Sequence, residues 1–332
     1  MLKNLLIFLI IFLSCADKRV ALGADNEIRV ICSEDDKKII KKYLSQIFTD
    51  TLFNPEPEPF YYLRFSLPET FPDLKTQAQV MVCAINQQVS NDGQKLMERL
   101  LSPEQFENTL NQDPVIVGKD VYAKKQIFTI INARSEDHLM KSIKEKKALF
   151  NKIFKDQFIS RQYKSLLGNY RNTNLEDSLS TVYPWTISIP WGWELIRDDE
   201  ERNFVWLGKE MPFQWIGIGW REGELVNDEL SIGSYIYKWP QNYYSNIQIN
   251  DYQFQLDSTN YNGSKAWRAR GIWETIDKKE AKGGPFQSYV FFEENLDRTY
   301  HLNYLIHHPG KDKSIYMRQM DMMVKSFKLN SK

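Results

Sequence analysis

The distribution of tryptophan divides this chain into two unlike parts. All nine tryptophans lie between Trp185 and Trp273, and the first 184 residues contain none. So large a shift in composition indicates two separately packed regions, and 332 residues are long for a single core. The stretch between the two parts is polar and turn-forming. We therefore predict domains at 28–168 and 182–332, joined by a linker at 169–181.

The first part alternates strand-like and helical patterns. Ile28–Cys32, Val80–Ile85 and Val121–Ile131 are rich in apolar and β-branched residues, which is typical of strands. Ser135 is well placed to cap a long helix, because apolar residues recur at helical spacing from there to Phe158. We expect a sheet of roughly four strands covered by helices.

The second part carries many short runs of β-branched and aromatic residues between turn-forming residues, followed by a helical pattern within Lys311–Phe327. These patterns predict an antiparallel sheet with a terminal helix. The predicted fold class is α+β, with two domains that each consist of a mainly antiparallel sheet packed with helices.

The N-terminus has the layout of a secretory signal. Lys3 is followed by an unbroken apolar run, Leu5–Leu13, and then by Ser14 and Cys15. Nine residues in a helix span only about 13 Å, at roughly 1.5 Å each, whereas a hydrocarbon core is about 30 Å thick. The run therefore indicates a signal peptide at 1–14 and not a permanent membrane span.

The cysteine adds a more specific prediction. Leu13-Ser14-Cys15 resembles the lipobox of bacterial lipoproteins, although Phe12 stands where that motif usually has leucine. The resemblance implies that Cys15 becomes the first mature residue and carries acyl chains such as palmitate, which bind the membrane. Residues 15–27 would then be a tether that reaches at most about 40 Å, at roughly 3.3 Å per residue.

The residues after the cysteine bear on location. Ala16 follows Cys15, so there is neither an aspartate directly after it nor an acidic run beyond it. These are the features associated with inner-membrane retention and with surface export of lipoproteins, respectively. We expect an outer-membrane anchor, with the folded body facing the periplasm.

Several longer stretches resemble a Bacteroidota family of lipoproteins classed as a domain of unknown function. The resemblance implies an envelope location and an architecture, but no reaction. The matching stretches are Gly118–Lys124, Asn203–Leu207, Ala266–Trp273, Gly283–Tyr289 and Pro309–Lys313.

A second resemblance concerns residues 182–328. The start Ile189-Pro190-x-Gly192-Trp193 and the closing Ser326-Phe327 are similar to the αβ sandwich of PsbP and Mog1. Proteins of that fold mostly act in binding or assembly, so the resemblance implies an interaction role by analogy.

The residues that carry chemistry are sparse. The chain has four histidines, and it lacks a Gly-x-Ser-x-Gly elbow. His307 and His308 are adjacent in a predicted strand and would point to opposite faces, so we expect no metal site, and we expect no cofactor. Cys32 and Cys83 lie in apolar strands, where they could be buried thiols or, in an oxidising compartment, a disulfide.

Charge excludes one class of partner. The whole chain has 43 basic and 43 acidic residues. Residues 1–14 contain one lysine and no acidic residue, so their removal leaves 42 basic and 43 acidic residues. A nucleic-acid-binding protein would show a basic excess, so nucleic acid is not expected.

The tryptophan-rich part holds the candidate binding residues. Trp215 and Trp220 lie in one predicted strand and should face opposite sides, and Arg268 and Arg270 share one face of another. The tryptophans could be core, a partner-binding surface or a platform for stacking glycans. The arginines are more typical of a salt-bridged surface than of an anion site. The candidate set is Trp215, Trp220, Trp267, Arg268, Arg270 and Trp273.

Two further residues are candidate modification sites. Thr51 and Ser178 each stand between aspartate and leucine, a pattern that resembles the O-glycosylation acceptors of Bacteroidota envelope proteins.

The leading hypothesis is a non-enzymatic envelope lipoprotein that acts as an interaction or assembly module and binds an envelope protein, as in an accessory factor of outer-membrane biogenesis. The alternatives are a lipoprotein that binds a glycan or a small ligand, and an unrecognised hydrolase.

Overall fold

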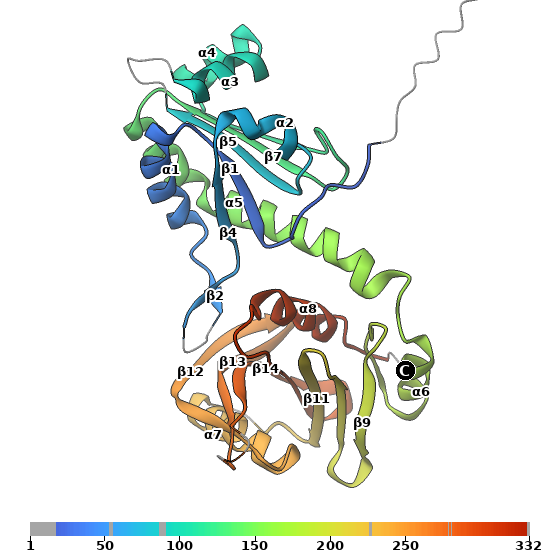
Figure 1. The fold of residues 1–332 in the computed structure, drawn as a ribbon. Helices are drawn as coiled ribbons and strands as arrows, with labels where there is room; N and C mark the ends of the chain where they lie inside the picture. The colour runs from blue at the N-terminus through green and yellow to red at the C-terminus, as the bar shows by residue number, and fades with distance from the viewer. Residues whose placement is uncertain are drawn as a thin grey trace, which may run out of the picture.

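The computed structural model of the protein describes residues 18–52, 56–85, 91–225, 228–277, 279 and 281–330. Two sheets lie one above the other in Figure 1, and the long helix α5 (Glu136–Tyr163) runs from the upper part toward the lower one. We call residues 18–168 the first half and residues 169–330 the second half. The mixed α+β class with two helix-packed sheets is confirmed.

The first sheet has the strand order β4-β1-β5-β7-β6. Its strands are β1 (Glu27–Ile31), β4 (Tyr62–Ser66), β5 (Gln79–Ile85), β6 (Val115–Lys119) and β7 (Ile127–Ala133). The β1–β4, β1–β5 and β5–β7 pairings are parallel, and β6–β7 is antiparallel. The expectation of a mainly antiparallel sheet is therefore wrong for the first half. A helix that connects two strands runs back along the sheet to the end at which the first strand began, so the second strand runs parallel to the first.

Helices cover both faces of this sheet. One face packs against α1 (Glu34–Ile47) and α5, and the other against α2 (Phe71–Leu74), α3 (Asp92–Leu100) and α4 (Pro103–Asn111). β5 and β7 are buried along their whole length, as expected of parallel strands with helices on either side. This double cover explains why the strands of the first half are continuous apolar runs.

One predicted strand of the first half is shorter than expected, and the strand before it was not predicted. Val121–Ile131 was expected as a single strand, but β7 begins only at Ile127, and β6 lies before the predicted range and ends at Lys119. Asp120 and Lys125 have φ angles of 56°, in the left-handed region that reverses a chain. The intervening loop therefore folds β6 back along β7, and the sheet gains a fifth strand.

The second sheet has the order β12-β13-β14-β15-β11-β10-β9, and all its pairings are antiparallel, as predicted. Helix α7 (Glu229–Tyr243) covers one face and α8 (Ser314–Lys325) the other. The strands are β9 (Glu194–Asp199), β10 (Phe204–Lys209), β11 (Phe213–Glu222), β12 (Ile247–Tyr261), β13 (Ser264–Thr275), β14 (Gly283–Glu293) and β15 (Arg298–His307).

Short elements complete the chain. They are β2 (Thr51–Leu52), β3 (Glu58–Pro59), β8 (Trp185–Thr186), β16 (Lys328–Leu329), the single turns η1 (Pro68–Thr70), η3 (Glu200–Arg202) and η5 (Glu294–Leu296), and the π-helical turn η2 (Lys164–Gly168).

The predicted linker at 169–181 is mostly helix. Helix α6 spans Thr173–Val182, and the side chain of Asn172 accepts a hydrogen bond from the backbone N–H of Leu175. Such a cap satisfies a helix N-terminus locally, which explains why a polar stretch without a strong apolar face is nevertheless helical.

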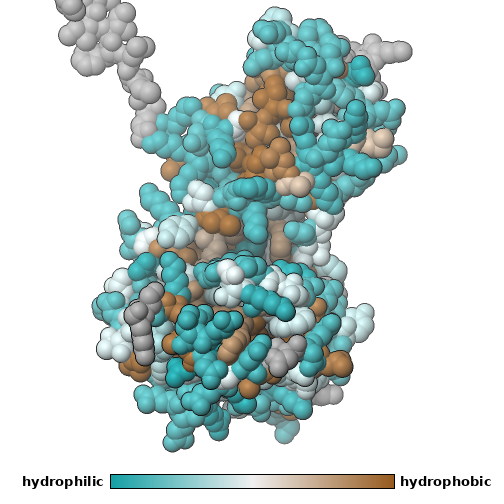
Figure 2. Space-filling model, turned by 180° about the vertical axis from the view of Figure 1, so that it is seen from behind, coloured by the Kyte–Doolittle hydropathy of each residue, from teal (hydrophilic) through white to brown (hydrophobic). Residues whose placement is uncertain are grey.

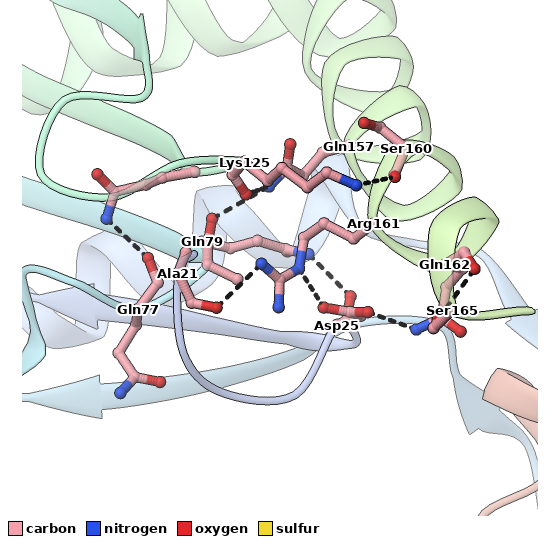
Figure 3. Close-up of polar contacts among 12 residues, drawn as sticks. Ala21, Asp25, Gln77, Gln79, Lys125, Gln157, Ser160, Arg161, Gln162 and Ser165 are labelled. Atoms are coloured by element: carbon pink, nitrogen blue, oxygen red, sulfur yellow. Dashed lines mark hydrogen bonds and ion pairs between the residues drawn. The ribbon is translucent and has the colours of Figure 1, made fainter. Parts of the chain in front are cut away.

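The predicted tether is also largely part of the folded body. Residues 1–17, which include the predicted signal peptide and Cys15, lie outside the described residues. From Lys18 onward the segment pairs with the first half through bridges Val20–Lys124 and Leu22–Gln77. Asp25 then joins this segment to α5: Figure 3 shows its carboxylate between Arg161 and Gln162, both of which donate to it.

The two halves contact each other through the start of α8. The Glu58 carboxylate accepts hydrogen bonds from the backbone N–H groups of Lys313 and Ser314, at 2.7 and 2.6 Å. Arg318 lies over the ring of Phe158, with its guanidinium carbon 3.4 Å from the ring centroid. Its Nη2 donates to the Tyr61 hydroxyl at 2.8 Å. Residues from β3, from the turn before β4 and from α5 thus hold the terminal helix.

The surfaces of the two halves differ. On the face seen in Figure 2, apolar side chains form a band over the first half, whereas the second half is mostly hydrophilic with isolated apolar side chains. None of the described helices is long and apolar enough to cross a membrane.

Candidate functional site

The predicted tryptophans lie on both faces of the second sheet. Trp215 contacts Trp206 and Trp273 on the α7 side, with ring centroids 4.8 and 6.1 Å apart. Trp220 packs against Tyr183 on the opposite face. The prediction that Trp215 and Trp220 face opposite sides is therefore confirmed.

Most of the tryptophans are core residues, and all nine lie in the described part of the chain. Five are buried, namely Trp185, Trp193, Trp220, Trp239 and Trp273. Trp206, Trp215 and Trp267 are partly buried, and Trp191 is 76 % exposed. Of the three alternatives, core packing therefore describes most of these side chains, because helices cover both faces of the sheet.

Two glycines explain how Trp239 fits against the sheet. A Cβ on Gly217 or Gly219 would lie 2.7 or 3.2 Å from the indole of Trp239. Because these two glycines have no side chain, Trp239 of α7 lies directly on β11. This close approach leaves no groove between helix and strand there.

The arginines form a salt-bridged surface, as expected. Arg268 and Arg270 both donate to one carboxylate oxygen of Asp257, at 3.1 and 2.9 Å. Burial opposes ionisation of Asp257, but the hydrogen bonds and charges of the two arginines outweigh it and lower its pKa. Two of the predicted residues are thus engaged within the sheet, and the predicted set does not converge on one site.

The exposed tryptophan is presented by a tight turn. The Trp193 N–H donates to the Pro190 carbonyl at 3.3 Å, and Gly192 has a φ of +83°. This is the geometry of a type II turn, which requires glycine at its third position. Trp191 occupies the second, outer corner, while Trp193 returns to the core. The turn therefore points one indole outward and the next inward.

A second exposed aromatic lies beside it. The Trp191 N–H donates to the Tyr170 carbonyl at 2.8 Å, and the Asn172 N–H donates to the Ile189 carbonyl at 2.8 Å. Tyr170 is 72 % exposed. We call Tyr170 and Trp191 the aromatic surface. Two hydrogen-bonded backbone segments hold it, so its position is set by the fold.

A hollow of about 440 Å³ adjoins Trp191. Its polar groups come from the first turn of α6 and from the start of β9, and its charges balance, since it has one arginine and one glutamate. The arginine, Arg171, is ion-paired with Glu176 at 2.7 Å. The lining residues are Arg171, Asn172, Thr173, Asn174, Trp191, Gly192, Trp193 and Glu194.

Sequence reasoning missed this site, although the signal was present. The candidate set contained neither Trp191 nor Tyr170. Proline followed two positions later by glycine, as in Pro190-Trp191-Gly192, is typical of a tight turn. A tryptophan between them is expected at the outer corner, where it cannot reach the core.

The thiols and the buried histidine are enclosed. Cys32 and Cys83 are both free and buried, so the open question between thiols and a disulfide is answered in favour of thiols. Burial raises the pKa of both, that of Cys32 to about 12. His301 is fully buried with its ring centroid 4.3 Å from that of Trp239. Burial lowers its pKa to about 3.

The remaining candidates lie at separate places. Thr51 is exposed in β2, and Ser178 is exposed in α6, where its hydroxyl donates to the Asn174 carbonyl at 2.8 Å. Their glycosylation stays a prediction. No group of three or more histidine, cysteine, aspartate or glutamate side chains in the described ranges is arranged to hold a metal ion.

Two family models match the chain. Residues 21–167 match one described as a domain of unknown function (DUF8532), and residues 220–326 match another described as a domain of unknown function (DUF4837). The predicted resemblance to domains of unknown function is confirmed. No curated protein matches the chain.

Several solved structures resemble part of the chain. The Ran-binding protein Mog1p of Saccharomyces cerevisiae has 9 % identity and a TM-score of 0.32, over 44 % of this chain and 90 % of that one. LpqN of Mycobacterium tuberculosis, described as involved in cell envelope biogenesis, has 10 % identity and a TM-score of 0.27, over 44 % and 83 %. Likenesses at this level do not bear on what the chain does.

Proposed function

We propose that this protein is a lipid-anchored component of the cell envelope that acts as a non-enzymatic interaction module through its aromatic surface. The observation that carries the proposal is the outward presentation of Trp191 and Tyr170, at 76 % and 72 % exposure, by fixed backbone. Tryptophan and tyrosine are the side chains that contribute most at protein interfaces. Since the fold already sets the position of these side chains, their ordering on binding would cost little conformational entropy.

The anchor belongs to the same proposal. The apolar run 5–13 followed by Ser14-Cys15 supports export and lipidation. An outer-membrane location facing the periplasm, with an envelope protein as partner, would suit an accessory factor of outer-membrane biogenesis. Intact mass of the membrane-extracted protein tests the anchor, because lipidation adds the mass of the acyl chains to a chain that begins at Cys15.

Site-specific crosslinking in living cells tests the partner. A photoreactive phenylalanine replaces Trp191 in one strain and Tyr252, which is 85 % exposed in β12, in the control strain. We expect a discrete adduct from position 191 and none of that mass from position 252. The adduct at 191 should disappear when Tyr170→Ala is combined with it, because half of the surface is then lost.

Equal labelling from both positions, or no adduct from either, would contradict the proposal. Crosslinking is chosen over simple co-purification because it reports contact at the named residue.

The hollow beside Trp191 favours one alternative, a small polar ligand such as a sugar. A pyranose presents C–H bonds to an aromatic face, and its hydroxyls both donate and accept hydrogen bonds, as the surrounding amides, hydroxyl and carboxylate do. Iodide quenching of tryptophan fluorescence should report mainly on Trp191. Protection from iodide by chitotetraose or maltotetraose, absent in Trp191→Ala, would favour this alternative over a protein partner.

A further inference from the structure

The described chain is attached to the folded body almost from its first residue. The Ala21 N–H donates to the Lys124 carbonyl at 2.9 Å, and the Lys124 N–H donates to the Arg19 carbonyl at 2.8 Å. The Lys18 ammonium donates to the carbonyls of Asp120 and Val121, at 2.7 and 2.9 Å. The segment thus lies along the loop that joins β6 to β7, at the side of the first half (Figure 1).

This attachment shortens the distance to the membrane. Three residue steps separate Cys15 from Lys18, and a chain extends by at most about 3.6 Å per residue. If Cys15 carries lipid, as the proposed function requires, Lys18 lies within about 11 Å of the lipidated residue. The 40 Å reach expected from the sequence does not apply, because residues 18–25 are held by the body.

The surface around this segment has exposed aliphatic side chains. Val20 is 54 % exposed and Leu22 is 61 % exposed, while Ala21 between them is buried. In an extended segment alternate residues share a side, so Val20 and Leu22 both point away from the body. Val121, on the adjoining loop, is 37 % exposed.

The same surface is basic. Three segments form this surface, namely 18–22, 72–77 and 119–125, and the bridges and hydrogen bonds given above join them. The Lys75 ammonium also lies 5.7 Å from the ring centroid of Tyr122 and so connects the second segment with the third. The three segments contain two acidic residues, Asp73 and Asp120. Their six basic residues are Lys18, Arg19, Lys75, Lys119, Lys124 and Lys125, of which Lys125 donates to the Ser160 carbonyl of α5 at 2.8 Å. We call the surface formed by these three segments the anchor face.

We propose that the anchor face rests on the membrane, with Val20 and Leu22 in the interface between headgroups and acyl chains and the basic residues against anionic headgroups. Aliphatic side chains flanked by lysine and arginine are the composition that binds such an interface. A single helix with its side chains is about 10–12 Å wide. A folded domain has at least two such layers, which is thicker than the reach of about 11 Å, so a folded partner does not fit between this face and the membrane, and lipid is the occupant.

Fluorescence quenching on vesicles tests this orientation. The full-length lipoprotein is purified in detergent and reconstituted in phosphatidylcholine vesicles with 30 % phosphatidylglycerol and a nitroxide-headgroup lipid on the order of a few per cent. Because Cys32 and Cys83 are buried, a thiol-reactive fluorophore labels single introduced cysteines. Leu22→Cys and Val121→Cys report on the anchor face; Tyr252→Cys and Leu230→Cys, at positions 85 % and 86 % exposed in the second half, are the controls.

We expect the nitroxide lipid to quench the labels at 22 and 121 at least twofold and to leave those at 252 and 230 nearly unchanged. Arg19→Glu with Lys119→Glu should reduce the quenching at position 22. The matched control is Lys37→Glu with Lys152→Glu, two lysines on helices of the first half whose side chains are 42 % and 73 % exposed, and it should leave the quenching unchanged. Equal quenching at all four positions, or no effect of charge reversal on the anchor face, would overturn the inference.

The two proposals fail separately. A mass without acyl chains would refute the anchor. A lipidated protein whose label at position 22 is no closer to the lipid than the label at position 252 would leave the anchor standing and refute the membrane-facing orientation.

Discussion

At the scale of single residues, the aromatic surface depends on one glycine. Gly192 has a φ of +83°, which a residue with a Cβ adopts only at a cost. We expect Gly192→Ala to lower the free energy of unfolding by about 1 kcal/mol or more and to weaken any crosslink from Trp191. Gly168→Ala is the control, because its Cβ would meet nothing closer than 3.8 Å. Urea unfolding measures both, and equal losses in the two variants would show that the turn is not the cause.

A second prediction at this scale concerns the effect of His301 on the pH dependence of stability. Burial beneath Trp239 lowers its pKa to about 3 from the ordinary 6.5, and neither ring nitrogen has a hydrogen-bond partner in the described chain. Between pH 6.5 and 3 the unfolded chain binds a proton there that the folded chain does not, so stability falls as the pH falls. The loss attributable to this residue between pH 7 and 5 is about 2 kcal/mol at most.

His301→Phe should remove that dependence, since phenylalanine preserves the ring packing and does not titrate. Urea unfolding at pH 7 and pH 5 gives the difference for each protein. An unchanged pH slope in the variant would mean that other groups account for the acid sensitivity.

At the scale of elements, the start of α8 depends on a residue of the first half. The buried carboxylate of Glu58 accepts from the N–H groups of Lys313 and Ser314, and a negative charge near a helix N-terminus is favourable. We expect Glu58→Gln to cost about 1 kcal/mol and Glu58→Ala about 2 kcal/mol. Glu56→Ala, two residues earlier and exposed, should cost nearly nothing in the same denaturant titration.

The elements that the sequence predicted well are those with local signals. Ser135 caps α5, which runs Glu136–Tyr163 along the predicted apolar stripe. Asn262-Gly263, a residue pair typical of hairpin turns, joins β12 to β13, and both residues have positive φ. Such features depend on neighbours within a few residues, so they are visible without a fold.

The elements that it predicted poorly depend on distant partners or on single polar residues. Strand direction in the first sheet follows from which helix connects which strands, not from the strand sequences. Helix α6 depends on the cap by Asn172. The exposure of Trp191 against the burial of Trp193 depends on Gly192 between them. None of these changes the apolar pattern that served for prediction.

At the scale of the whole molecule, the two halves should unfold together. Tryptophan content divides the chain, but Arg318 of α8 is enclosed by Phe60, Tyr61 and Phe158 of the first half, with its guanidinium carbon 5.6, 4.8 and 3.4 Å from their ring centroids. Burial lowers the pKa of this arginine, which the nearby Tyr61 hydroxyl partly offsets. The ammonium of a lysine cannot reproduce the stacking of a planar guanidinium on aromatic rings. Arg318 therefore couples the halves, together with the hydrogen bonds of Glu58 to the start of α8.

We expect one cooperative thermal transition in the intact protein and two resolved transitions in Arg318→Ala, because α8 then loses its main contact with the first half while the second sheet keeps its own core. Arg318→Lys should behave like the alanine variant. Lys152→Ala, which removes an exposed ion pair on α5, is the control and should keep a single transition, since surface pairs contribute little. Scanning calorimetry distinguishes these outcomes. A single transition in Arg318→Ala would mean that the remaining contacts, such as those of Glu58, suffice to couple the halves.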